Sequence, residues 1–148
     1  MKILFVYANR DDPCTIKSCF ELSKGLKKYV ESSTEVYYTK LNDELIEAND
    51  IIIFQRLGAN GILISKLDEE KIFDIIRRFY NKKIFIYMID DLLIEEQNGL
   101  PKRFLKECHS VICPNEPMKQ QVNSYCKQCF ILRTYVDIEA IDVIKKEI

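Results

Sequence analysis

The sequence predicts an α/β fold in which a mostly parallel β-sheet lies between two layers of helices. Short runs of strand-forming residues alternate along the chain with stretches of helical periodicity, which is the pattern of parallel strands joined by right-handed crossovers. Residues 84–89 are apolar at every position, as expected for an inner strand covered on both faces. This run ends in Asp90 and Asp91. Ligands of open parallel sheets bind outside the carboxyl ends of the strands, so these acids stand where such a fold places its chemistry.

The composition indicates one domain that is large enough to bury about two thirds of its unfolded surface. The 148 residues include 22 Lys and Arg against 23 Asp and Glu, which lacks the basic character of a nucleic-acid-binding protein. No long apolar run and no signal peptide is present, so we expect a cytoplasmic protein. We expect the domain to cover residues 1–137, followed by a terminal helix or the start of an interdomain linker over residues 138–148.

Each predicted element has a local sequence signal. Strands are expected where β-branched and aromatic residues cluster, at residues 2–8, 34–39, 51–54, 83–91, 110–113 and 128–132. Helices are expected at residues 15–29, 42–48, 100–108 and 115–125, and in a segment with apolar residues at helical spacing: Ile72, Ile75, Ile76 and Phe79. Asp68 and Asn115 are candidate N-caps, and Pro101 suits a first helical turn.

The turn after the first strand, residues 9–14, lacks the glycines that bring backbone close to a phosphate. Asp11 and Asp12 in this turn would repel a phosphate, so we expect no flavin mononucleotide there. Paired acids also occur in phosphoacceptor receiver domains, but the Asp and Lys that those domains need at later strand ends are replaced by Gln55-Arg56 and Cys113-Pro114. A solvated turn that caps the first helix is the simpler interpretation of this acidic pair.

Five potential metal ligands fall close together near the end of the chain: Cys108, His109, Cys113, Cys126 and Cys129. Two of these cysteines, at positions 113 and 129, lie in predicted strands, where a free thiol behaves as a small apolar group. A redox Cys-x-x-Cys pair opens a helix, whereas this one precedes a strand. We therefore expect reduced thiols, no zinc and no disulfide, with His109 as a turn residue.

The acidic pair at residues 90 and 91 is expected to face Gln55 and Arg56 at the end of the neighbouring strand. An arginine beside paired acids keeps one of them ionised, and together they can orient sugar hydroxyls. The next segment, residues 57–65, contains Gly58 and Gly61 in a loop at the same rim, where loops carry function. Arg10, after the first strand, is the other cation expected there.

The order of these motifs resembles the N-terminal domain of retaining bacterial glycosyltransferases of the B fold, of the family 4-like type. The matching segments read KILFVYA, NDIIIFQR, a strand closing in IDD, CHSVICPNEPMKQQV and CFILRTYVD. They cover nearly the whole chain and are individually loose but jointly specific. Two features depart from the family: the Gly-rich turn after the first strand is missing, and residues 114–116 match only approximately.

The resemblance implies roles for the rim residues. Asp90 and Asp91 would border the interdomain cleft near the transferred sugar as catalytic residues. The residues that would shape the acceptor side are Gln55, Arg56, Gly58, Asn60, Gly61 and Arg10. Residues 135–137 resemble the segment that closes the family's first domain. The nucleotide-sugar half of such an enzyme, with its Glu-x7-Glu-type motif, is absent from this sequence.

We therefore expect a Rossmann-like three-layer domain that serves as the acceptor-binding half of a glycosyltransferase in polysaccharide biosynthesis. Its expected partners are a glycan or glycoconjugate acceptor and a nucleotide-sugar, the latter held by a missing C-terminal domain or partner subunit. Peripheral association with a membrane is compatible with such an acceptor. No cofactor, metal or nucleic acid is expected. The alternative is a free-standing doubly wound binding module without catalysis, and a reading frame continuing past Ile148 into a second domain would favour the enzyme.

Overall fold

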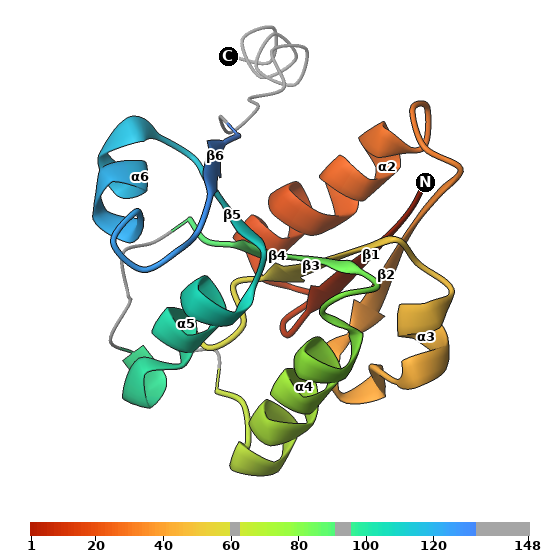
Figure 1. Ribbon diagram of the computed structural model, residues 1–148. Coiled ribbons are helices and arrows are strands. Elements are labelled where there is room, and N and C mark those ends of the chain that lie inside the picture. Colours follow the sequence, from red (N-terminus) through yellow and green to blue (C-terminus); the bar gives the residue numbers. More distant parts are fainter. Residues whose placement is uncertain (60–62, 91–95, 133–148) are drawn as a thin grey trace, which may run out of the picture.

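The computed structural model describes residues 1–59, 63–90 and 96–132, with only the backbone for residues 96–98. Its centre is a six-stranded sheet in the order β2-β1-β3-β4-β5-β6, in which every neighbouring pair is parallel (Figure 1). The strands are β1 (Lys2–Tyr7), β2 (Ser32–Tyr37), β3 (Ile51–Gln55), β4 (Ile84–Met88), β5 (Ser110–Cys113) and β6 (Cys129–Ile131). This is the predicted Rossmann-like three-layer α/β fold, and β4 is an inner strand as expected.

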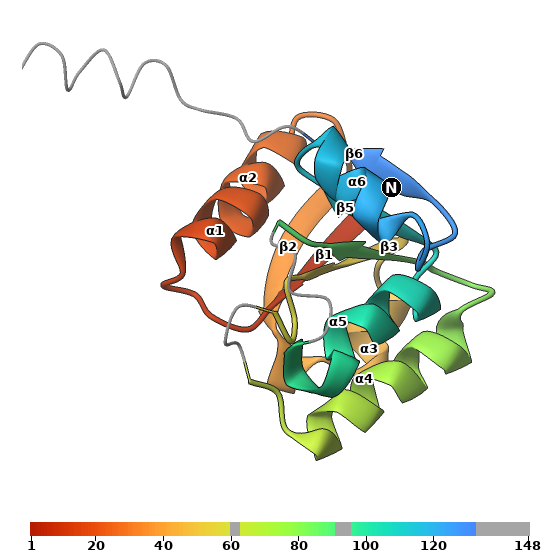
Figure 2. The ribbon, with the colours of Figure 1, turned by 90° about the vertical axis from the view of Figure 1, so that its left-hand side faces the viewer.

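Helices cover the two faces of the sheet unequally. The helices are α1 (Pro13–Thr15), the π-helix η1 (Ile16–Glu21), α2 (Leu22–Leu26), the 3-10 helix η2 (Tyr38–Lys40), α3 (Asp43–Glu47), α4 (Lys66–Phe79), α5 (Glu96–Glu107) and α6 (Glu116–Val122). One face carries α1, η1 and α2, which follow one another without a break, and the other carries α3, α4 and α5 (Figure 2). The rule that parallel strands need long crossovers explains why every connection contains a helix.

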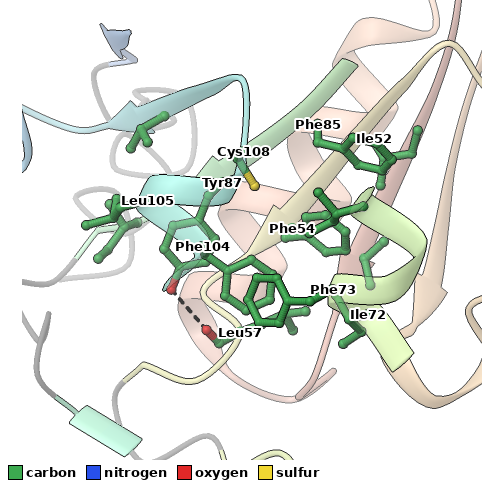
Figure 3. Close-up of a cluster of buried hydrophobic side chains, with 14 of the residues drawn as sticks. Ile52, Phe54, Leu57, Ile72, Phe73, Phe85, Tyr87, Phe104, Leu105 and Cys108 are labelled. Atoms are coloured by element: carbon green, nitrogen blue, oxygen red, sulfur yellow. Dashed lines mark hydrogen bonds between the residues drawn. The ribbon is translucent and has the colours of Figure 1, made fainter. Parts of the chain in front are cut away.

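The larger core lies between the sheet and α3 to α6, and aromatic rings fill its centre (Figure 3). The ring of Phe104 on α5 lies 5.3 Å from that of Phe54, 4.7 Å from that of Phe73 and 4.9 Å from that of Tyr87, measured between centroids. The buried Tyr87 hydroxyl donates a hydrogen bond of 3.0 Å to the carbonyl of Leu57. This bond ties the core to the turn that follows β3, so packing and site geometry are linked.

The smaller core lies under the α1-η1-α2 segment and contains Ile3, Phe5, Cys19, Ile53 and Met88. The same sheet face is less covered toward β6, where Ile84 and Phe130 remain about half exposed, at 48% and 49%. Burial is therefore concentrated around β1, β3 and β4. These are the strands whose carboxyl ends carry the candidate site residues.

Several element boundaries differ from the predictions for local reasons. The second strand runs two residues earlier than predicted, because residues 32–37 pair in register with β1 and Tyr38–Lys40 then form a 3-10 turn. The first helix spans residues 13–26 instead of 15–29, since Asp12 caps it and Pro13 occupies its first position. The last helix ends at Val122 instead of near Tyr125.

The N-cap prediction for Asp68 is wrong. Ser65 caps α4, because its hydroxyl accepts a hydrogen bond of 3.1 Å from the Asp68 N–H and donates one of 2.6 Å to the Asp68 carboxylate. This is a reciprocal capping pair, in which the residue three positions on supports the cap instead of being it. The Asn115 side chain caps α6 as predicted. The Asn42 side chain caps α3, a role that the sequence analysis did not assign to it.

The helix predicted to start at residue 100 begins earlier, at Glu96, so Pro101 lies inside it instead of in its first turn. Gly99 has a φ of 78°, a left-handed conformation that costs glycine little.

None of the helices in the described residues is long and apolar enough to cross a membrane. The predicted domain end at residue 137 and the segment 138–148 lie outside the described residues.

We expect Phe104→Ala to lower the free energy of unfolding by about 3–5 kcal/mol, because it removes a ring from the middle of the aromatic core. Leu67→Ala is the control, since this side chain is 81% exposed and its truncation should change stability by less than about 0.5 kcal/mol. Urea unfolding followed by circular dichroism measures both. Equal losses in the two variants would contradict this account of the core.

Candidate functional site

The candidate site lies at the switch point of the sheet, where connections leave in opposite directions. From β1 the chain crosses to β2 on one side, and from β3 it crosses to β4 on the other. Such a divergence separates the two loops and leaves room for a ligand at the carboxyl ends of the strands. Here it brings together Asp12 after β1, Gln55 and Arg56 at the end of β3, and Asp90 after β4.

Arg56 is the centre of this arrangement. Its side chain is only 1% exposed, and its Nε lies 2.8 Å from Asp90 Oδ1 as an ion pair. Its Nη1 donates a hydrogen bond of 3.3 Å to Asp90 Oδ2 and lies 3.6 Å from Asp12 Oδ2. A buried guanidinium is tolerated only with such partners, because an unpaired charge loses its hydration without compensation. The prediction that Arg56 and Asp90 share one rim, beside an inner strand, is confirmed.

The backbone at Arg56 is also unusual. Its φ of 50° lies in the left-handed region, which non-glycine residues rarely adopt. The Arg56 N–H donates to the Met88 carbonyl at 2.9 Å, and the Arg56 carbonyl accepts from the Ala59 N–H at 3.1 Å. Gly58, with a φ of 77°, completes the turn. Strained backbone of this kind persists where surrounding contacts hold it, and it concentrates at functional sites.

Asp12 combines two roles. Its Oδ2 accepts hydrogen bonds from the Thr15 N–H at 2.9 Å and from the Thr15 hydroxyl at 3.1 Å, so it caps the helix as the sequence indicates. The same oxygen is the one that approaches Arg56. A helix N–H group that could bind a phosphate is therefore already bound to a carboxylate of the chain itself. The contact with Arg56 was not predicted, since nothing local in the sequence relates the two positions.

Gln55 is fully buried beside this pair. Its Oε1 accepts a hydrogen bond of 2.9 Å from the Thr15 hydroxyl, and its Nε2 has no hydrogen-bond partner among the residues that the structure describes. The Thr15 hydroxyl has one proton, which it gives either to Gln55 or to Asp12. Gln55 therefore connects the sheet to the start of the helix.

The thiol of Cys14 also belongs to the site, although the sequence analysis did not assign it there. Burial raises the pKa of this half-buried thiol, and the charge of Asp90 and a hydrogen bond with Asp90 raise it further, while the charge of Arg56 lowers it. The thiol thus stays protonated. A signal that could have identified it is its position two residues after Asp12.

The remaining predicted site residues are placed as follows. Gly58 is buried in the turn after β3. Arg10 is exposed, with its guanidinium 5.8 Å from the centroid of the Phe20 ring. Asn60, Gly61 and Asp91 lie outside the described residues. The structure thus brings Arg56 and Asp90 together with Asp12, which the sequence did not place in the site.

The cysteines and His109 make packing contacts and hydrogen bonds within the fold. All six cysteines are free thiols, and within the described ranges no group of three His, Cys, Asp or Glu side chains is arranged to hold a metal ion. Cys113 and Cys129 touch across β5 and β6 with sulfurs 3.4 Å apart, and burial raises the pKa of Cys129 to about 12. His109 precedes β5, where its ring stacks on Tyr80 at 3.9 Å and its Nδ1 accepts from the Phe85 N–H at 3.1 Å.

A shallow hollow lies at the opposite edge of the sheet. Its lining is formed by Ile76, Arg77, Tyr80, Lys106, Glu107 and Lys127. These side chains come from the ends of α4 and α5 and from the turn before β6, and cations in the last helical turns complement the helix dipoles. The rim around Arg56 is the stronger candidate, because its charged groups are buried and mutually oriented.

Replacing Arg56 by Met should lower the free energy of unfolding by about 3–5 kcal/mol, because two partly buried carboxylates would lose their shared cation. Arg78→Met is the matched control: Arg78 pairs with Asp43 and Asp74 on the exposed surface, where ion pairs add little. Chemical denaturation of the two variants compares them. If Arg78→Met lowered the free energy of unfolding as much as Arg56→Met, burial would not explain how much an ion pair of this protein contributes to stability.

Compared with known proteins, the chain matches no family model, no curated protein and no solved structure.

Proposed function

We propose that this chain is the acceptor-binding half of a two-domain glycosyltransferase, with the carboxyl rim around Arg56 and Asp90 as its acceptor side. The observation that carries the proposal is the buried Arg56, clamped between Asp12 and Asp90 at the switch point of the sheet. The resemblance of the sequence to B-fold glycosyltransferases names the enzyme class. The geometry supplies the reason for assigning the sugar to this rim.

Asp90 has the features of a hydroxyl-binding group. Both of its carboxylate oxygens contact Arg56, and its side chain is still 23% exposed at the rim. Ionised carboxylates accept strong hydrogen bonds from hydroxyl donors, and an arginine that holds the carboxylate in place reduces the entropy lost on binding. A rigid, half-exposed acid is suited to orienting a sugar hydroxyl for attack on a donor.

The same rim is unsuited to a nucleotide diphosphate. The Thr15 N–H is bound to Asp12, and two carboxylates flank the guanidinium. Activation of a nucleotide leaving group requires cations or free backbone N–H groups at the diphosphate. The donor would therefore be held by a second domain, and catalysis would occur in the cleft between the two.

Simple methyl glycosides should bind the isolated chain at this rim with millimolar affinity, because the acceptor half retains its own hydroxyl-binding groups. The measurement is a titration with methyl glucoside, galactoside, mannoside and N-acetylglucosaminide, followed by the backbone amide resonances of Gln55, Arg56 and Asp90. Amides around Asp43, an exposed acid on α3, serve as the internal control. If every glycoside left the rim resonances unchanged, the acceptor role would be lost.

Nucleotide-sugars, in contrast, should show no micromolar binding to the isolated chain, since the part of the rim that the structure describes lacks free groups that hold a diphosphate. Isothermal calorimetry with uridine- and guanosine-diphosphate sugars is the test. Micromolar binding would mean that the donor site lies on this domain and that the chain is a nucleotide-binding protein in its own right.

A further inference from the structure

The Arg56 cluster occupies a position where similar sheets bind anions. A guanidinium beside the first helix N-terminus at a switch point would attract phosphate strongly if it had no internal partner. Among the described residues, two carboxylates share the guanidinium, and Arg56, Asp12 and Asp90 together carry one net negative charge. The trio therefore favours a ligand without negative charge.

We propose that Asp12 is a specificity-determining residue, which closes Arg56 to phosphate groups and leaves the rim selective for an uncharged, hydroxyl-bearing part of the acceptor. The inference rests on the proposed function in taking this rim as the acceptor side. It adds the class of ligand group that the rim accepts and the residue that sets it.

The position of Asp12 explains why it excludes anions, whereas Asp90 forms the main ion pair with Arg56. Asp12 Oδ2 lies 3.6 Å from Arg56 Nη1, longer than the 2.8 Å contact between Arg56 Nε and Asp90. Asp12 is held instead by the bond from the Thr15 N–H and by its contact with the Thr15 hydroxyl, and its side chain is 18% exposed. It thus stands beside the guanidinium without forming the main ion pair, where its charge opposes an approaching anion.

Asp12 can be neutralised without losing the helix cap. Asn and Ser are as good N-caps as Asp, so Asp12→Asn and Asp12→Ser keep an acceptor for the Thr15 N–H. Asp12→Asn removes the charge at constant size, and Asp12→Ser also opens space next to Arg56. Asp11→Asn is the matched control, because Asp11 is exposed in the same turn and its loss changes the net charge of the protein equally.

The test follows the Arg56 Nε–H resonance during titrations with inorganic phosphate, with sodium chloride at matched ionic strength as the blank. In the native chain, phosphate should shift this resonance no more than chloride does. In Asp12→Ser we expect saturable phosphate binding at least about tenfold tighter than in the native chain, since one unit charge a few ångström away changes affinity by that order. Asp12→Asn should show a smaller gain in the same direction, and Asp11→Asn none.

Three results would overturn the inference: saturable phosphate binding by the native chain, no gain in either Asp12 variant, or an equal gain in Asp11→Asn. Each is distinguishable from failure of the proposed function. The glycoside titration decides whether the rim binds sugars, and the phosphate titration decides whether Asp12 excludes anions. A rim that binds neither probe natively but gains phosphate in Asp12→Ser would support the role of Asp12 and remove the acceptor role.

Discussion

The rest of this structure depends on the burial of one positive charge. Arg56 stands at the end of an inner strand with almost no solvent contact, and moving a guanidinium out of water is costly unless carboxylates replace its hydration. Asp90 supplies the main ion pair and Asp12 a second, longer one. These acids follow β4 and β1, so one electrostatic requirement fixes the relative positions of three strand ends. That requirement explains why the rim is ordered around β1, β3 and β4.

The aromatic core and the left-handed turn after β3 also hold Arg56 in place. Tyr87 donates to the Leu57 carbonyl, and the Arg56 N–H donates to the Met88 carbonyl, so the turn after β3 is bound to β4 on both sides. These bonds offset the strain of a φ of 50° at Arg56. Packing around Phe104 and charge pairing around Arg56 are thus energetically coupled, and loss of either should weaken the other.

The acids at the rim also make it unsuited to binding a phosphate group. Many doubly wound sheets present free N–H groups to phosphate at the first helix, whereas here Asp12 accepts the Thr15 N–H itself. An internal carboxylate thus takes the place of an external anion. This exchange is consistent with the proposed function, in which the domain binds neutral hydroxyl groups and a second domain holds the charged part of a donor. The proposed function and the proposed role of Asp12 share this physical basis.

The sequence by itself determined the order and type of the elements, because strand runs and helical periodicity are local properties. It also predicted the inner position of β4 and the meeting of Arg56 with Asp90, since two apolar strands ending in polar residues share one rim. The caps were partly predicted: Asn115 fits, but Ser65 and not Asp68 caps α4, a choice that depended on side-chain geometry.

Only the tertiary structure decided the features that join distant segments. The contact of Asp12 with Arg56, the bond from Thr15 to Gln55 and the thiol of Cys14 beside Asp90 depend on how the first helix lies on the sheet. The earlier start of β2 follows from its register with β1, a long-range pairing that local propensity does not encode. Charge burial at Arg56 is of the same kind, since a sequence shows which residues are charged but only the packed fold shows which charge has lost its water.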